Sequence, residues 1–195
     1  CGQKKPLADF VADAYGKTRQ CKQCPMSLRA TYTGYFERQA AGLCGKHALN
    51  NLLGKAAFTE EDLSMLCNHY ILLKDWEDGL QDGEDATWHC EEGGWFSSEL
   101  LAYALRHASF VLGPPHESFE LVLDSADNVV DNLKEEDTIG ALQNRDGAHW
   151  VAIKKEGDAV ILLDSLAQPV SLGAASLHEV IAQWPHTYAV KRLYA

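Results

Sequence analysis

The spacing of apolar residues predicts three helices in the first half of the chain, preceded by a short amphipathic helix. The apolar face of that first helix, spaced i, i+3, i+4 and i+8, consists of Leu7, Phe10, Val11 and Tyr15. A Leu-rich helix is predicted from Leu43 onward and should end at Gly54, since glycine is common just after a helix. Residues 59–62 resemble a capping box that opens the next helix, and Ser97 or Ser98 can cap the third.

The second half of the chain has the pattern of strands. Short apolar runs are separated there by Gly, Pro, Asn or Asp, at residues 109–112, 119–123, 138–142, 149–154, 159–163 and 187–193. One helix, at about 174–183, interrupts these runs. Helices followed by strands are typical of an α+β fold, here with a helical lobe packed on an antiparallel sheet.

Composition narrows the class of protein. The 195 residues carry a net charge of −11, and their length suits a compact domain, while a hydrophobic fraction of 46% argues against wholesale disorder. The excess of acid argues against a nucleic-acid partner, because phosphate binding needs clustered Lys and Arg. The longest uncharged stretch, 165–178, is too short to span a bilayer, and we expect no signal peptide, because no charged segment followed by an apolar one is visible at the start. We therefore expect an intracellular monomer, cytoplasmic or nuclear, that favours a basic partner.

The six cysteines are too few for a disulfide-built scaffold, so we expect reduced thiols. Cys21 and Cys24, spaced C-x-x-C, could form half of a zinc site. The residues that could complete it are Cys67, His69, His89 and Cys90. Since a second C-x-x-C is missing from the sequence, chance spacing is the better interpretation, and we expect neither a metal nor another cofactor.

Cys44 is the candidate nucleophile. It lies in the first turn of the predicted Leu-rich helix, where the partial positive charge of unpaired N–H groups favours thiolate over thiol. A buried structural cysteine is the alternative, so Cys44 needs a base and a group that orients the base before it suggests catalysis.

His149 and Asp164 are the candidate base and orienter. Two strands joined by a two-residue turn at Glu156 and Gly157 would place them directly opposite one another. The carboxylate could then accept the imidazole N–H and stabilise the imidazolium. A three-residue loop would instead pair His149 with Ser165, and a surface His–Asp pair without a catalytic role remains an alternative.

Gln39 and His47 flank the candidate nucleophile. The amide of Gln39, five residues before Cys44, could join the Cys44 backbone N–H in an oxyanion hole. His47 shares a helical face with Cys44 and is the competing base. We favour His149, because an orienting carboxylate can be derived for it alone, and we expect His47 to be a packing or supporting residue.

These residues resemble the Josephin family of papain-like cysteine proteases, which are deubiquitinating enzymes. The segments that match its motifs are Gln39 through Leu53, Gly94-Trp95-Phe96-Ser97, His149-Trp150 and Asp164-Ser165-Leu166. The resemblance implies a Josephin-type papain-like fold and a triad of Cys44, His149 and Asp164, with Gln39 in the oxyanion hole. It also implies hydrolysis of the bond after the C-terminal glycine of ubiquitin, with ubiquitin or polyubiquitin as the partner. Some members of the family have Asn as the third member of the triad, where this chain has Asp164.

The resemblance covers residues 35–195, which we expect to form the catalytic domain. Residues 1–34 have no counterpart and are interpreted as an N-terminal extension that carries the short amphipathic helix. The stretch 75–92, rich in Asp, Glu and Gly, is predicted to be an exposed acidic loop or a loose helical excursion.

The resemblance also indicates supporting and substrate-binding residues. Trp150 would support His149 from the next position of its strand, and Trp95, Ser98 and Glu99 would contact substrate at the start of the third helix. Ser98 and Glu99 stand where the family carries apolar residues. Two other functions stay open, namely a papain-like peptidase that cuts after a double-glycine leader and a ubiquitin-binding module without catalysis.

Overall fold

The computed structural model describes residues 10–12, 18–21, 32–39, 42–78, 89–91, 95–108 and 117–193. Its helices are α1 (Cys44–Leu53), α2 (Glu60–Asp78), α3 (Ser98–Arg106), α5 (Ala126–Asn132) and α6 (Ala174–Gln183). Its strands are β1 (Phe10–Ala12), β2 (Thr18–Cys21), β3 (Cys90–Glu91), β4 (Trp95–Phe96), β5 (Ser118–Leu123), β6 (Thr138–Arg145), β7 (His149–Glu156), β8 (Ala159–Leu163), β9 (Val170–Leu172) and β10 (Thr187–Leu193). Within these ranges no helix is long and apolar enough to cross a membrane. The predicted strand 109–112 lies outside the described residues.

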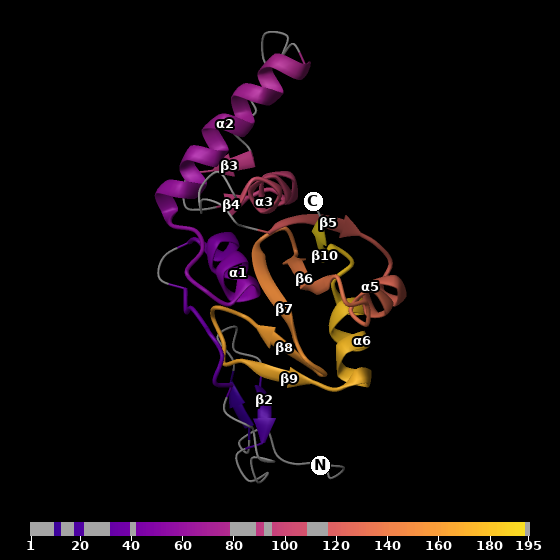
Figure 1. Ribbon diagram of the computed structural model, residues 1–195. Helices are drawn as coiled ribbons and strands as arrows, with labels where there is room; N and C mark the ends of the chain where they lie inside the picture. The colour runs from indigo at the N-terminus through magenta and orange to yellow at the C-terminus, as the bar shows by residue number, and fades with distance from the viewer. Residues whose placement is uncertain are drawn as a thin grey trace.

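A six-stranded sheet forms the centre of the protein (Figure 1). Its strands follow the order β5-β10-β6-β7-β8-β9, and every neighbouring pair is antiparallel. Tight hairpins join β6 to β7 and β7 to β8, so three strands that are consecutive in the chain lie side by side. The predicted α+β fold with an antiparallel sheet is confirmed.

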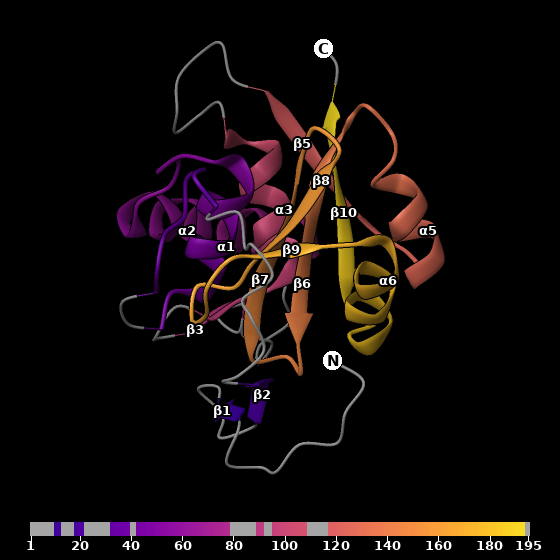
Figure 2. The same ribbon diagram turned by 90° about the horizontal axis from the view of Figure 1, so that it is seen from below.

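Helices cover both faces of this sheet (Figure 2). Helices α1 and α3 pack on one face, over a core that includes Leu49, Leu101 and Trp150. Helices α5 and α6 pack on the other face, over a second core that includes Ile153 and Ile181. Because successive side chains of β7 point to opposite faces, Trp150 and Ile153 enter different cores. Helix α2 projects away from the sheet beside α3 (Figure 1).

The helix ends follow the chemistry expected from the sequence. Gly54 ends α1 in the left-handed conformation, with φ 73°. At the start of α2, the Asp62 carboxylate accepts the Thr59 backbone N–H at 2.8 Å, and the Thr59 hydroxyl accepts the Asp62 N–H at 3.1 Å. Ser97, and not Ser98, caps α3, since its hydroxyl oxygen accepts a backbone N–H of the first turn at 3.1 Å.

The predicted helix near the start of the chain is wrong where the structure describes it. Phe10–Ala12 forms the strand β1, which pairs antiparallel with β2. Aromatic and β-branched residues such as Phe10 and Val11 favour strands, and an isolated helix of about ten residues is marginal in water. Leu7 and Tyr15 lie outside the described residues.

Several short elements were not expected from the sequence, namely α5 and the strands β2, β3, β4 and β9. Helix α5 has seven residues and fully buries only Val129, and β9 has three residues. Elements this short do not repeat a hydrophobic period often enough to reveal their type.

Candidate active site

Cys44 is the first residue of α1, the helix that packs against β7. Its side chain is 5% exposed and carries a free thiol. The N-cap residue Leu43 offers no side-chain hydrogen bond and the first turn holds no acidic residue, so no carboxylate in this turn offsets the positive end of the helix dipole beside the sulfur. A Cβ at Gly45 would come within 2.8 Å of the Phe96 ring, so glycine permits the close approach of β4 to this turn.

The backbone N–H of Cys44 is engaged within the loop that precedes α1. It donates to the Gly42 carbonyl oxygen at 2.9 Å, across Leu43 with φ −80° and ψ 45°, in an inverse γ-turn. In the conformation seen here this N–H is already engaged, and its role as an oxyanion-hole donor remains a prediction. A rotation of the peptide between Gly42 and Leu43 would release it.

The register between β7 and β8 differs by two residues from the predicted one. Glu156 pairs with Ala159, so Gly157, with φ 59°, takes the first position of the turn and not the second. A shift of two residues keeps each side chain on its predicted face, whereas a shift of one would have moved it to the other face. His149 therefore stays on the same face as Asp164, as a diagonal neighbour instead of a direct one.

His149 and Asp164 form a buried hydrogen-bonded pair. The distance from His149 Nε2 to Asp164 Oδ1 is 2.9 Å, and each residue is 8% exposed. Burial by itself would lower the pKa of His149, but hydrogen bonds with Asp164 and Cys44, and the charges of both, outweigh it and raise the pKa to about 9. Since Asp164 engages Nε2, Nδ1 is the ring nitrogen left for the thiol of Cys44. The ring of His149 thus links the carboxylate to the sulfur.

The second oxygen of Asp164 is held by Arg145, a residue that sequence analysis missed. Arg145 Nη1 lies 3.0 Å from Asp164 Oδ2, and Arg145 Nε donates to Gln143 Oε1 at 3.1 Å. Burial would raise the pKa of the Asp164 carboxyl, but the hydrogen bonds from His149 and the Leu166 backbone N–H, with the charges of His149 and Arg145, lower it. The hairpin from β6 to β7 places Arg145 opposite His149. The short loop of this hairpin was the signal in the sequence that could have placed Arg145 beside His149.

Gln39 lies in the segment that precedes α1, beside the turn that follows β8. Its backbone N–H donates to the Ser165 carbonyl oxygen at 3.1 Å. Two residues earlier, Glu37 is fastened to α1, because its backbone N–H donates to Asn51 Oδ1 at 2.6 Å and its carboxylate accepts from Asn50 Nδ2 at 2.9 Å. The consecutive asparagines of the first motif therefore hold the segment that carries Gln39.

His47 also has a carboxylate partner, which corrects the expectation that none could be found for it. His47 Nδ1 lies 3.2 Å from Glu37 Oε2, and Lys46 Nζ lies 3.4 Å from the other oxygen. Burial would raise the pKa of Glu37, but its contacts with Asn50, His47 and Lys46 lower it. His47 is 3% exposed and binds the segment before α1, whereas His149 is the histidine coupled to Cys44.

The remaining predicted site residues lie around β4 and the start of α3. Trp150 is 2% exposed and its indole N–H donates to the Phe96 carbonyl at 2.8 Å, which ties β7 to β4. Trp95 belongs to β4, and the Ser98 hydroxyl donates to Glu99 Oε2 at 3.0 Å in the first turn of α3. That Trp95, Ser98 and Glu99 contact substrate remains a prediction.

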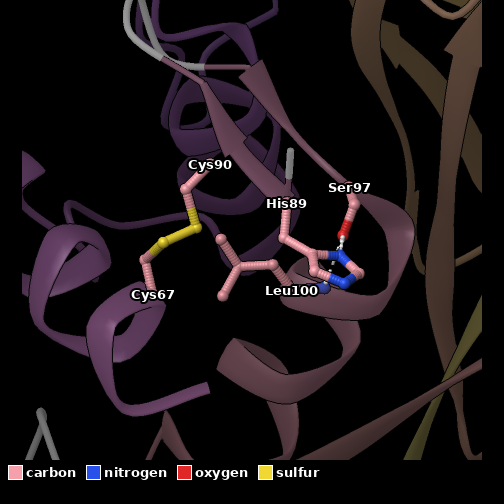
Figure 3. Close-up of a disulfide and its surroundings, with 5 residues drawn as sticks. All are labelled: Cys67, His89, Cys90, Ser97 and Leu100. Atoms are coloured by element: carbon pink, nitrogen blue, oxygen red, sulfur yellow. Dashed lines mark hydrogen bonds between the residues drawn. A yellow bond between two sulfur atoms is a disulfide. The ribbon is translucent and has the colours of Figure 1, made fainter. Parts of the chain in front are cut away.

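Cys67 and Cys90 form a disulfide that joins α2 to β3 (Figure 3). The expectation of reduced thiols is wrong for this pair, which folding brings together beside Leu100. Their sulfurs bind each other instead of a zinc ion, and His89 Nδ1 lies 2.8 Å from the Ser97 hydroxyl oxygen. Among the described residues no cluster of three or more His, Cys, Asp or Glu could hold a metal. Cys24 lies outside them.

Comparison with known proteins agrees with this architecture. The Josephin family model matches residues 39–189. An "Ataxin-3 homolog" of Caenorhabditis briggsae is 30% identical over 139 residues, and an "Ataxin-3 homolog" of Caenorhabditis elegans is 30% identical over 138 residues. Each match covers 68% of this chain and 39% of the relative, so the chain spans well under half the length of these proteins. The family match extends from Gln39 through both hairpins to β10, and the chain therefore belongs to the Josephin family.

Proposed function

We propose that this protein is a cysteine-type deubiquitinase that hydrolyses peptide or isopeptide bonds at the C-terminal glycine of ubiquitin. One observation carries the proposal: the imidazole of His149 is bound through Nε2 to Asp164 and is coupled on its other side to the thiol of Cys44. A thiol coupled to an imidazole that is in turn bound to a carboxylate is the arrangement that thiol proteases require.

The charge state of this group suits the first step of the reaction. With a pKa of about 9, His149 is an imidazolium at neutral pH, which stabilises a thiolate on Cys44. The thiolate attacks the carbonyl carbon of the terminal glycine and forms a C–S bond. The scissile C–N bond then breaks while His149 transfers its proton to the leaving amine, which leaves a thioester.

Hydrolysis of the thioester restores the enzyme. Neutral His149 takes a proton from water, whose oxygen attacks the thioester carbonyl carbon, and the C–S bond breaks to release the ubiquitin carboxylate. Asp164 keeps the imidazole oriented and stabilises its charged form in both steps. Gln39 donates through its amide N–H₂ to the developing oxyanion, and the Cys44 N–H joins it once the γ-turn opens.

The substrate class is inferred from the family and from charge. The Josephin family, which this chain belongs to, consists of proteases that act on ubiquitin. The net charge of −11 suits a basic partner. The chain matches only part of the curated relatives, so its partners belong to the proposal.

The test is labelling with ubiquitin that carries a C-terminal thiol-reactive electrophile. We expect one covalent adduct on the wild type, none on Cys44→Ala, strongly slowed labelling on His149→Ala and little change on His47→Ala. Labelling lost in His47→Ala but kept in His149→Ala would overturn the assignment of the base. Ubiquitin binding without labelling or cleavage would favour a binding module, and cleavage of double-glycine leader peptides alone would favour a leader peptidase.

A further inference from the structure

Ser165 and Gln39 are joined by two hydrogen bonds, although 126 positions separate them in the chain. The Gln39 backbone N–H donates to the Ser165 carbonyl at 3.1 Å, and the Ser165 hydroxyl donates to Gln39 Oε1 at 3.0 Å. Ser165 is 4% exposed, so water competes little for these bonds. Both the backbone and the carboxamide of Gln39 are therefore held by one residue.

The side-chain bond determines which half of the carboxamide is available. An amide has an acceptor oxygen on one side and a two-hydrogen donor on the other. The Ser165 hydroxyl engages the oxygen, which leaves the N–H bonds of Nε2 for a different partner. An oxyanion needs a donor, and a flipped amide would present the wrong atom to it.

Ser165 lies in a turn that is fixed by hydrogen bonds of its neighbour. It directly follows Asp164, whose carbonyl accepts the Ala167 N–H at 2.9 Å and whose Oδ1 accepts the Leu166 N–H at 3.0 Å. Asp164 is further fixed by His149 at 2.9 Å and by Arg145 at 3.0 Å. The turn after β8 thus carries the residue that orients the base and the residue that holds Gln39.

We propose that Ser165 is a positioning residue that aims the carboxamide of Gln39 at the carbonyl oxygen of the substrate. This inference rests on the proposed function, because it assumes that Gln39 stabilises an oxyanion. Ser165 does not touch the reacting atoms and acts through Gln39, so it contributes to kcat more than to substrate binding.

The experiment compares Ser165→Ala, Gln39→Ala and the double variant in steady-state cleavage of a fluorogenic amide at the C-terminus of ubiquitin. Loss of an oxyanion donor typically costs 10²–10³ in rate, so we expect Gln39→Ala to lower kcat by about 10². Ser165→Ala keeps the Gln39 amide but removes the hydrogen bond that orients it. We therefore expect a loss in kcat of about tenfold with KM unchanged. In the Gln39→Ala background Ser165→Ala should have no further effect, and Ser165→Thr should restore most of kcat.

Controls separate positioning from folding and from the proposed function. Ser176 donates its hydroxyl to the Gly173 carbonyl at 2.9 Å on α6, and Ser176→Ala should leave kcat unchanged. Alkylation of Cys44 by iodoacetamide forms no oxyanion and should proceed equally in Ser165→Ala and the wild type. Wild-type kcat in Ser165→Ala, or additive losses in the double variant, would overturn the role of Ser165 while the protease assignment stands. An inactive wild type would overturn the proposed function and this inference together.

Discussion

Replacing Asp164 by asparagine separates the charge of this side chain from its hydrogen bond. The amide oxygen of Asp164→Asn can still accept the Nε2 proton of His149, as the carboxylate does at 2.9 Å. The negative charge that favours the imidazolium is lost. We therefore expect a small loss of activity at neutral pH and a larger one at alkaline pH.

The size of the expected loss of activity follows from the pKa of His149, which rises from 6.5 to about 9 in the folded protein. This difference corresponds to about 3 kcal/mol in favour of the imidazolium, shared between Asp164 and Cys44. If removal of the carboxylate charge lowers the pKa by about one unit, the protonated fraction at pH 9 falls about fivefold, while at pH 7 it changes by about a tenth. The direction of the change is fixed, because the imidazolium of His149 is lost as pH rises and the variant loses it at a lower pH than the wild type.

The assay is kcat/KM for a fluorogenic ubiquitin C-terminal amide, measured from slightly acidic to alkaline pH. Asp127→Asn is a matched control, because Asp127 Oδ1 also lies 2.9 Å from a histidine, His178, on the exposed side of the molecule. We expect its profile to overlay that of the wild type. An alkaline limb that stays in place in Asp164→Asn, or a loss as large as that of Cys44→Ala, would refute the reasoning.

Three further predictions concern the support of the site. Arg145→Gln should move the acid limb of kcat/KM to higher pH, because the guanidinium helps keep the pKa of the Asp164 carboxyl low; an acid limb at its wild-type position would contradict this. Replacing Cys67 and Cys90 by serine should lower the free energy of unfolding in urea by about 3 kcal/mol, from the loop entropy of a 23-residue separation, with reduced wild type matching the variant. Asn50→Ala should lower the free energy of unfolding by about 3 kcal/mol in the same assay, because it leaves several buried backbone groups without their hydrogen-bond partner. A loss below about 1 kcal/mol would contradict this role of Asn50.

Local chemistry made several parts of the fold predictable. Helix ends depend on residues within one turn of the helix, so neighbouring residues in the sequence predict them. Examples are the caps Thr59 and Ser97 and the terminal Gly54. The apolar runs that form β5 to β8 and β10 were predicted as strands because their residues are also neighbours in the chain. The helix predicted around Leu7 to Tyr15 was wrong at Phe10–Ala12, because a four-residue pattern does not distinguish a short helix from a β-hairpin.

The pairing of β7 with β8 shows how an imprecise register can still lead to the correct neighbours. The turn lies one residue later than predicted, which shifts the pairing register by two residues, and the side-chain period of a strand is also two. His149 and Asp164 consequently remained on one face and within hydrogen-bonding distance. Had the loop contained one more or one fewer residue, the interpretation would have failed.

The sequence by itself determined the order of the longer helices and strands, the position of Cys44 at a helix start and the shared face of His149 and Asp164. These properties depend on residues close in the chain or on a simple period. Only the tertiary structure decided that Arg145 holds Asp164, that Glu37 pairs with His47, that Ser165 holds Gln39 and that Cys67 bonds Cys90. Each of these contacts joins residues of different segments, so it depends on how those segments pack in three dimensions and not on a local pattern of residues.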